Sequence, residues 1–430
     1  MNYYQFADDF LFSHNQHPDQ ISIDEITRLM LTDMENGLNG QKSSLMMIPT
    51  YLTASTNFHS DESVIVIDAG GTNLRIAALD FSEGKPKILK YEKKKMLGTD
   101  ETLSWRQFIS QLTDLLIPYL TFSKKIGFCF SFPAEILPNK DGKVLSFCKE
   151  VNITDCKNKI LGEEIRRELT SRHLSDDIQI VVLNDTVATL LGGTNTESDQ
   201  HFDGHIGLIL GTGTNTAYVE KRDNIKKLSF CATETMIINM ESGMFDKVPQ
   251  GDFDKIVDCY SNNPHDHKFE KMISGVYLGN VIAQTIKQAD IVGLFSEKNK
   301  IRLLPDFSMV EVDSFLRHPF GNNLLSEVCQ NLQDKELLFY FIDKAIERSS
   351  KLVCANLAAD ILQMNGGKKR CMPTQIVIEG STYHKCYSYK EKIGYYMHNY
   401  INNQLQRYYF FDSGEDVNLI GSGKAALINL

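Results

Sequence analysis

A glycine-rich turn with polar side chains stands between two apolar segments early in the chain. The turn, Asp68–Arg75, follows the β-branched run Val64–Ile67, which predicts a buried strand. Glycines without a Cβ would let a phosphate reach backbone N–H groups, while a threonine and an arginine would add donors. A carboxylate suits the water shell of Mg²⁺. A plain β-hairpin uses the same turn residues, so the turn alone leaves both interpretations open. The residues concerned are Asp68, Gly70, Gly71, Thr72, Asn73 and Arg75.

A second copy of this pattern occurs later in the chain. Leu208–Asn215 repeats the order of Val66–Asn73, namely an apolar strand, a turn with Gly-Thr-Asn and another strand. Two copies predict two related halves, each offering one phosphate-binding turn to a shared cleft. Neither the P-loop motif nor a G-x-G-x-x-G between strand and helix occurs, so these two nucleotide-binding classes are excluded. The second turn contains Gly211, Thr212 and Gly213.

An Asn-Asp pair ends a third apolar run. Val181–Leu183 predicts a strand, and Asn184, Asp185 and Thr186 follow it before an amphipathic segment. Asp185 and Thr186 stand where a helix N-cap is expected. Open α/β sheets also place ligands at the carboxyl ends of their strands, where Asp185 could act as a general base. The spacing leaves both interpretations open.

Two isolated carboxylates, Glu241 and Glu270, stand in apolar or mixed surroundings. The run Met236–Met240 before Glu241 is predicted to be buried, so its carboxylate needs a hydrogen-bonding partner. A sugar hydroxyl, an arginine or a backbone amide would serve. His265 and His267 have no third ligand at a helical or strand spacing, which favours a solvated loop over a metal site.

Bulk composition limits the function further. The chain has 430 residues and a net charge of −10, without a basic block, which argues against nucleic-acid and membrane-surface binding. Nine cysteines without a C-x-x-C pair argue against disulfides and structural zinc. We find no apolar signal or membrane-spanning run, and we expect a soluble cytoplasmic protein.

Strand-like and helix-like segments alternate from residue 64, which predicts an α/β fold with a domain boundary near residue 60. The predicted strands are 64–67, 75–80, 125–130, 179–183, 206–210 and 216–220. The predicted helices are 103–118, 161–173, 268–288, 334–363 and 386–405, and a further helix begins at Ser22.

Taken together, these residues resemble the hexokinase/glucokinase family of the actin-like ATPase superfamily. The likeness runs from Glu25 to Asn429, and its segments occur in the family's order. They are Ser44–Tyr51, Asp68–Arg75, Phe130–Pro133, Cys148–Lys149, Leu183–Val187, Gly211–Asn215, Ile238–Glu241, Phe269–Gly275, Glu379–Tyr383 and Gly421–Lys424. The resemblance implies a two-domain actin-like (ribonuclease H-like) fold with a central cleft. A small lobe would span 60–190 with 421–430, and a large lobe 1–59 and 191–420.

The resemblance also implies roles for individual residues. ATP and Mg²⁺ would be the cofactors, and a hexose, most simply glucose, would be phosphorylated at its 6-hydroxyl in the first step of glycolysis. Asp185 would be the base, with Lys149 and Arg75 also catalytic, and Asp68 would hold Mg²⁺ through water. The sugar would contact Ser131, Phe132, Cys148, Lys149, Asn184, Asp185, Asn215, Glu241 and Glu270. The nucleotide would contact Asp68, Gly70, Gly71, Thr72, Asn73, Arg75, Gly211, Thr212, Gly213, Gly380 and Ser381.

Three positions depart from the family pattern: Cys148, Ser242 after Glu241, and Glu347. The departures at Cys148 and Ser242 bear on sugar selectivity, and the one at Glu347 bears on nucleotide affinity. They keep two alternatives open, a catalytically silent sugar sensor and a kinase of the same fold for another sugar. A monomer or a homodimer is expected.

Overall fold

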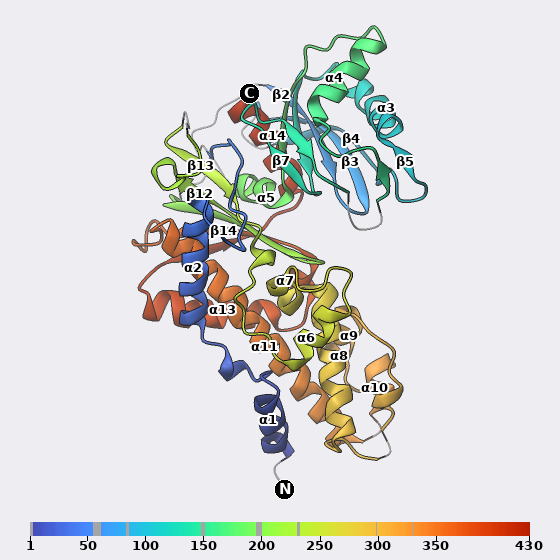
Figure 1. Cartoon of the computed structure of the whole chain (residues 1–430), viewed down its shortest axis with the longest axis vertical. Coiled ribbons are helices and arrows are strands. Elements are labelled where there is room, and N and C mark those ends of the chain that lie inside the picture. Colours follow the sequence, from blue (N-terminus) through green and yellow to red (C-terminus); the bar gives the residue numbers. More distant parts are fainter. Residues whose placement is uncertain are drawn as a thin grey trace.

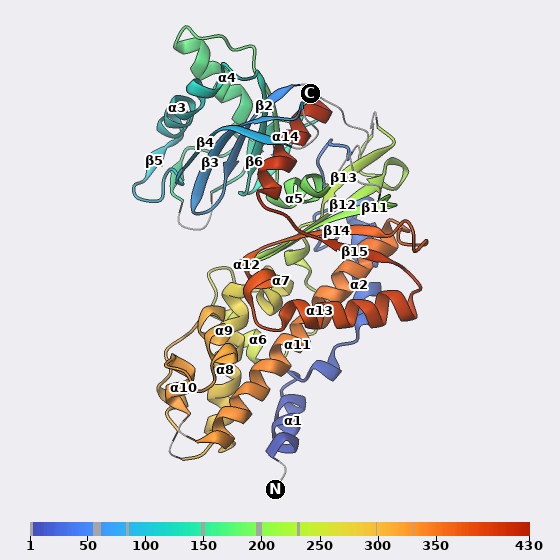
Figure 2. The same cartoon turned by 180° about the vertical axis from the view of Figure 1, so that it is seen from behind.

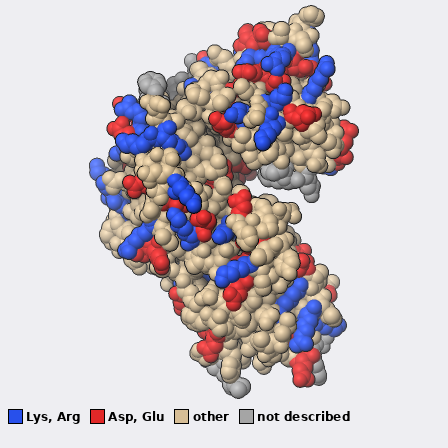
Figure 3. Space-filling model, viewed as in Figure 1, with Lys and Arg blue, Asp and Glu red and all other residues tan. Residues whose placement is uncertain are grey.

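Two separate β-sheets, each with its own helices, build the molecule (Figure 1). The computed structural model describes residues 3–54, 62–82, 86–147, 151–194, 200–229, 233–297, 299–329 and 331–430. The space-filling view is hollowed at one side, between the five-stranded sheet and the helices of the larger lobe (Figure 3). The predicted two-lobed α/β fold is confirmed.

The smaller sheet has five strands in the order β10-β6-β2-β3-β4, and the larger has six in the order β1-β13-β12-β11-β14-β15. The five strands are β2 (Ser63–Ala69), β3 (Asn73–Asp80), β4 (Lys87–Lys95), β6 (Lys125–Phe130) and β10 (Gln179–Leu183). The six are β1 (Ile48–Pro49), β11 (Gly204–Leu210), β12 (Thr214–Lys221), β13 (Thr235–Asn239), β14 (Thr374–Glu379) and β15 (Tyr409–Asp412).

The two sheets repeat one topology. In the smaller, β2, β3 and β4 pair antiparallel in sequence, and β6 and then β10 add parallel to the other side of β2. In the larger, β11, β12 and β13 take the antiparallel places, and β14 and β15 the parallel ones. The predicted repeat is therefore a repeat of the fold, with the two glycine-rich turns at equivalent hairpins, β2–β3 and β11–β12.

The last strand of each repeat leads into a helix, and the two helices pack against each other between the sheets (Figure 2). These helices are α5 (Asp185–Gly193) and α14 (Val417–Asn429). A Cβ on Gly421 would lie 1.8 Å from the Ala188 carbonyl oxygen, so only glycine permits this approach. Each helix also packs on the sheet of the other repeat. Gly127 of β6 and Gly207 of β11 face the backbones of α14 and α5.

The remaining helices complete the lobes. Small-lobe elements are α3 (Trp105–Leu116), α4 (Leu161–Ser171) and the short strand pairs β5 (Leu103–Ser104) with β9 (Ile153–Thr154) and β7 (Ala134–Ile136) with β8 (Gly142–Val144). The larger lobe contains α1 (Tyr3–Ser13), α2 (Ile23–Leu38), α6 (Asp252–Cys259), α7 (Lys268–Ile273), α8 (Gly275–Ile291), α9 (Met309–Arg317), α10 (Leu324–Val328), α11 (Leu332–Gln363), α12 (Ser381–Lys385) and α13 (Tyr389–Met397). None of the helices within the described ranges is long and apolar enough to cross a bilayer.

Most predicted elements are present, and the differences have tertiary causes. The predicted helix 268–288 is interrupted at Ser274, whose backbone is extended, because the Gly275 N–H donates to the Gly211 carbonyl (2.8 Å). The segment 386–405 is α13 followed by a π-helical turn, His398–Gln404. The sequence Gly421–Lys424 lies inside α14, a helix that the sequence pattern did not predict. The exact lobe boundaries stay a prediction, since α5 and α14 contact both sheets.

Asp360, in the middle of α11, carries a buried carboxyl group. Neither oxygen has a hydrogen-bond partner within the described structure, and burial raises the pKa of this group well above its ordinary value. The folded state therefore retains a proton that the unfolded chain releases near its ordinary pKa. The stability that this group contributes is fully present below that value and is lost as pH rises toward the folded-state pKa.

Replacement of Asp360 with asparagine should remove this pH-dependent loss. Because asparagine has no proton to retain, we expect the variant to gain up to about 1.4 kcal/mol in free energy of unfolding over the wild type for each pH unit between pH 6 and pH 8, the free energy of one pKa unit. The cost of burying the asparagine amide is the same at both pH values, so the difference from the wild type should be larger at pH 8 than at pH 6. Urea unfolding at both pH values measures it, with the exposed Asp223→Asn as control. An equal gain at both pH values would contradict the explanation.

Candidate active site

The β2–β3 hairpin pairs a buried carboxylate with an arginine. Asp68 and Arg75 are opposite each other in the strand register, and the Arg75 Nε–H donates to Asp68 Oδ2 (2.7 Å). The Asp68 side chain is 7% exposed. Burial raises its pKa and the Arg75 charge opposes that rise. Arg75 also lies 3.6 Å from Asp416, the residue before α14. Its guanidinium therefore contacts carboxylates of both repeats.

The tips of the two equivalent hairpins present free donors. Thr72 and Thr212 are exposed, and their hydroxyls have no partner among the described residues. Helix α12 holds the second tip in place, because the Thr382 hydroxyl donates to the Gly211 carbonyl (2.8 Å). Gly380 has φ +120°, and a Cβ there would lie 2.3 Å from the Leu210 carbonyl oxygen. Gly380 and the exposed Ser381 thus lie beside the second hairpin, and their role in nucleotide binding stays a prediction.

Asn184, and not Asp185 or Thr186, caps helix α5. The Asn184 side-chain oxygen accepts from the Thr186 N–H (2.9 Å), so the prediction of a cap at Asp185 or Thr186 is wrong by one residue. Asp185 is the first residue of the helix, and the Thr186 hydroxyl lies 3.4 Å from its carboxylate. The Asp185 charge raises the pKa of Asp68 and of Glu241. The Asp185 charge therefore acts on both the first hairpin and the Glu241 region.

A chain of amide side chains links α5 to Glu241. Asn215 Nδ2 donates to Asn239 Oδ1 (2.7 Å) and lies 3.4 Å from Asn184 Oδ1. Asn239 Nδ2 in turn donates to Glu241 Oε1 (2.8 Å), and the Ser242 N–H donates to Asn215 Oδ1 (3.2 Å). These hydrogen bonds hold amide and carboxylate groups from three parts of the fold in one polar surface. Such a surface matches a ligand with several hydroxyl groups.

Glu270 of α7 joins this surface through the second hairpin. Its Oε2 accepts from the Thr214 N–H (2.9 Å), and a Cβ on Gly213 would lie 2.5 Å from that oxygen. Burial raises the pKa of Glu241, the Asn239 hydrogen bond opposes this, and the Glu270 charge adds to it. The predicted burial of the strand before Glu241 is confirmed. A positive charge on His267, the residue before α7, would lower the pKa of Glu241.

The other predicted sugar-side residues are only partly described. Ser131 follows β6, and its N–H donates to the Ala69 carbonyl (3.1 Å), beside the first hairpin. Phe132 is buried in an aromatic cluster, 4.8 Å between ring centroids from Phe147. Cys148 and Lys149 lie outside the described residues, so their roles stay predictions. Glu347 accepts a hydrogen bond from the Tyr396 hydroxyl (2.6 Å).

Sequence analysis missed three residues of the site. Asn239 completes the amide chain, Asp416 is the second carboxylate beside Arg75, and Cys129 is a strand-register partner of Asp68 and hydrogen-bonds to it. Asn239 is the last residue of β13, and a polar side chain at the end of a buried run could have indicated it. Nothing in the sequence near Cys129 or Asp416 indicates a partner so distant along the chain.

Models of known protein families match the chain in two parts. Both are described as hexokinase, one over residues 11–194 and the other over residues 205–428, just over half of the chain. The chain belongs to the hexokinase family. The two matches meet in the region 195–204, so α5 closes the first and β11 opens the second. Each match therefore contains one of the two repeats.

Several hexokinases are similar to this chain in sequence. The chain is 28% identical to Hexokinase-5 of Oryza sativa over 397 residues, 83% of this chain and 76% of that protein. It is 27% identical to the Hexokinase-like 1 protein of Arabidopsis thaliana over 440 residues, covering 94% and 87%. It is 27% identical to Hexokinase-3 of Rattus norvegicus over 406 residues, but spans only 42% of that protein.

Solved hexokinase structures share the fold. The hexokinase from Schistosoma mansoni complexed with glucose superposes with a TM-score of 0.79 at 21% identity, covering 99% of this chain and 100% of that one. A second structure described as a hexokinase gives a TM-score of 0.80 at 19% identity and covers 99% of each chain. At these identities the likeness concerns the fold.

Proposed function

We propose that this chain is an active ATP-dependent hexokinase that transfers the γ-phosphate to the 6-hydroxyl of glucose or a related hexose, as in the first step of glycolysis. The location of Asp185 carries the proposal. Asp185 directly follows Asn184, which joins the amide groups leading to Glu241, and its charge raises the pKa of both Asp68 and Glu241. Because Asn184 caps the helix, Asp185 is not needed as a cap.

The hexose would bind the amide and carboxylate surface. Asn184, Asn215 and the two glutamates offer both donors and acceptors, which suit the several hydroxyls of a pyranose. Hydrogen bonds among these groups hold them in place before the sugar arrives, which lowers the ordering cost of binding. Ser131, Phe132, Cys148 and Lys149 are proposed to complete the sugar site.

The nucleotide would bind across the two hairpin tips. The unpartnered hydroxyls of Thr72 and Thr212 and the glycine backbones beside them fit phosphate oxygens, and Arg75 adds a cation. Within the described residues no cluster of three His, Cys, Asp or Glu side chains could hold a metal. Mg²⁺ is therefore proposed to come with the phosphates, with Asp68 contacting its water shell.

Asp185 would remove one proton in the reaction. As the hexose 6-oxygen forms its bond to the γ-phosphorus, the bond from that phosphorus to the β-phosphate oxygen breaks, and the hydroxyl proton passes to the Asp185 carboxylate. Phosphoryl transfer depends mainly on positioning and on neutralising charge, so a carboxylate base and fixed donors are sufficient. Closing of the lobes would exclude water and limit ATP hydrolysis.

A coupled assay of ADP production with glucose, mannose and fructose tests the proposal. We expect turnover with at least one of them, and ranking by kcat/KM would identify the preferred sugar. Calorimetric glucose binding without ADP production would instead support a sugar sensor, an alternative that the three departures from the family pattern keep open. We also propose cytoplasmic action as a monomer or homodimer.

Hexose binding should weaken at acidic pH because of Glu241. Its ionised carboxylate is the acceptor that a sugar hydroxyl needs, and burial raises the pKa of this group above the ordinary glutamate value. The hexose KM should therefore rise as pH falls toward that raised pKa, before an exposed glutamate would protonate. A Glu241→Gln variant should have a KM that is raised at neutral pH and does not vary with pH in this range. A KM in Glu241→Gln with the wild-type pH dependence would contradict this assignment.

A further inference from the structure

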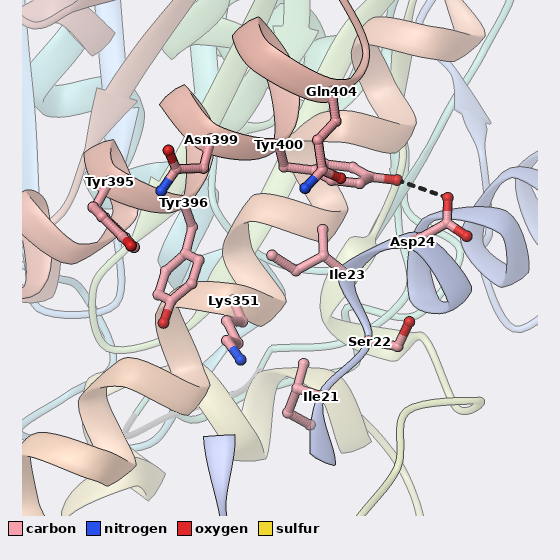
Figure 4. A pocket seen from close by; sticks show the side chains of 10 residues that line it. All are labelled: Ile21, Ser22, Ile23, Asp24, Lys351, Tyr395, Tyr396, Asn399, Tyr400 and Gln404. Carbon is pink, nitrogen blue, oxygen red and sulfur yellow. Dashed lines mark hydrogen bonds between the residues drawn. The ribbon is translucent and has the colours of Figure 1, made fainter. Parts of the chain in front are cut away.

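A cavity of 340 Å³ lies on the larger lobe between the start of α2 and the end of α13 (Figure 4). Its volume is in the range of small-molecule pockets, about 300–1,000 Å³. Three tyrosines line it, Tyr395, Tyr396 and Tyr400, together with the amides of Asn399 and Gln404. None of these residues belongs to the proposed active site.

The backbone of this wall departs from an α-helix. His398–Gln404 forms a π-helical turn, in which the Leu405 N–H donates to the carbonyl of Tyr400, five residues earlier (2.9 Å). π-turns are rare and occur frequently at functional sites. Gln404, the last residue of this turn, lines the cavity together with Tyr400.

Each of the two charged groups at the cavity, Lys351 and Asp24, already has an oppositely charged partner. Lys351 donates to the Pro18 carbonyl (2.8 Å), lies 3.4 Å from Asp19, and stands 5.4 Å from the centre of the Tyr396 ring. Asp24 pairs with Arg28 (2.7 Å) and accepts from the Tyr400 hydroxyl (3.1 Å). A ligand with a net charge would have to displace these partners, so the cavity favours an uncharged one.

Polar groups without partners remain at the cavity. The Tyr395 hydroxyl and the Gln404 amide make no hydrogen bond within the described chain, and the Asn399 amide is approached only by Asn403 at 3.4 Å. Ring faces for C–H groups, with amides for hydroxyls, are the combination that a pyranose ring uses. We propose that this cavity binds a neutral saccharide of one or two rings, at a site separate from the catalytic one. The proposal does not depend on the proposed function.

Maltose is the probe, and its binding to the full chain can be followed by saturation-transfer NMR and calorimetry. We expect Gln404→Ala and Tyr395→Ala each to weaken maltose binding about tenfold, the effect of losing one good contact. Both side chains are exposed, so the melting temperature should not change. The control is Tyr260→Ala, a tyrosine that is 89% exposed and outside the cavity.

A Glu270→Ala variant separates the cavity from the proposed hexose site. Maltose binding should persist in this variant, while phosphorylation of hexose is lost. Maltose binding that disappears in Glu270→Ala but survives in Gln404→Ala would place the saccharide in the hexose site and overturn the proposal. Absence of binding at millimolar maltose, or an equal loss in Tyr260→Ala, would overturn it as well. Failure of hexose phosphorylation in the wild type would leave these binding results unaffected.

Discussion

Asp185→Asn should lower kcat for hexose phosphorylation by about 10²–10⁴-fold, the contribution of a positioned general base. Asparagine has nearly the same size but cannot take the hydroxyl proton. The amide and carboxylate groups of the sugar surface are unchanged in this variant, so the hexose dissociation constant should change little. The split between a large fall in kcat and a small change in binding is the signature of a base rather than of a binding residue.

A matched control accounts for the place of Asp185 in its helix. A carboxylate in the first turn stabilises a helix by about 0.3–1 kcal/mol through the helix dipole, and the substitution removes that as well. Asp252 has the same place, the first residue of α6, and also contacts His14 (2.9 Å), so Asp252→Asn should cost at least as much stability and leave kcat unchanged. Thermal unfolding with steady-state kinetics measures both variants. An Asp185→Asn enzyme with a tenth or more of wild-type kcat would mean that another group accepts the proton.

The first hairpin shows why a turn motif alone was ambiguous. Asp68–Arg75 is a β-hairpin, and it also holds an ion pair between Asp68 and Arg75. A hairpin and a phosphate-binding turn are therefore not exclusive interpretations of this segment. The equivalent hairpin at Gly211 was predictable because the repeat preserves local sequence. The sequence could not indicate the pairing of Arg75 with Asp416. This pairing depends on the packing of α5 and α14, each against the sheet of the other repeat.

The start of α5 shows a different limit. Asn and Asp are equally good N-caps, and helix ends are uncertain by one or two residues from sequence. A shift of one residue in the cap position decides whether the Asp185 carboxylate accepts a hydrogen bond from the helix backbone or is available for catalysis. Asn239 was missed because its partner Asn215 is on the neighbouring strand, and the register of β12 and β13 brings them together. Helix α14 was missed because its glycines have low helix propensity, which close packing on α5 overrides.

Arg75→Ala should have the second largest effect, because it should lower both kcat and the free energy of unfolding. If the guanidinium stabilises phosphate charge in the transition state, its removal should lower kcat by about 10²–10³-fold, as loss of one such donor does. The buried Asp68 carboxylate also loses its partner, at a cost of about 1–3 kcal/mol in the free energy of unfolding. Arg75→Lys keeps the charge without the forked geometry, so it should recover much of the stability and less of kcat.

Arg166→Ala distinguishes the catalytic loss from the structural one. The Arg166–Asp141 pair closely resembles that of Arg75 and Asp68, with side chains 31% and 3% exposed against 26% and 7%. Asp141 also accepts from two backbone N–H groups, those of Gly142 and Gly162 (2.8 Å each), so Arg166→Ala should cost less stability and leave kcat near wild type. Single-turnover rates at saturating ATP, with hexose binding by calorimetry, compare the variants. Similar kcat losses in Arg75→Ala and Arg166→Ala would assign the effect to weakened packing of the lobe. A loss confined to Arg75→Ala, with hexose affinity unchanged, would assign it to the phosphate side of the cleft.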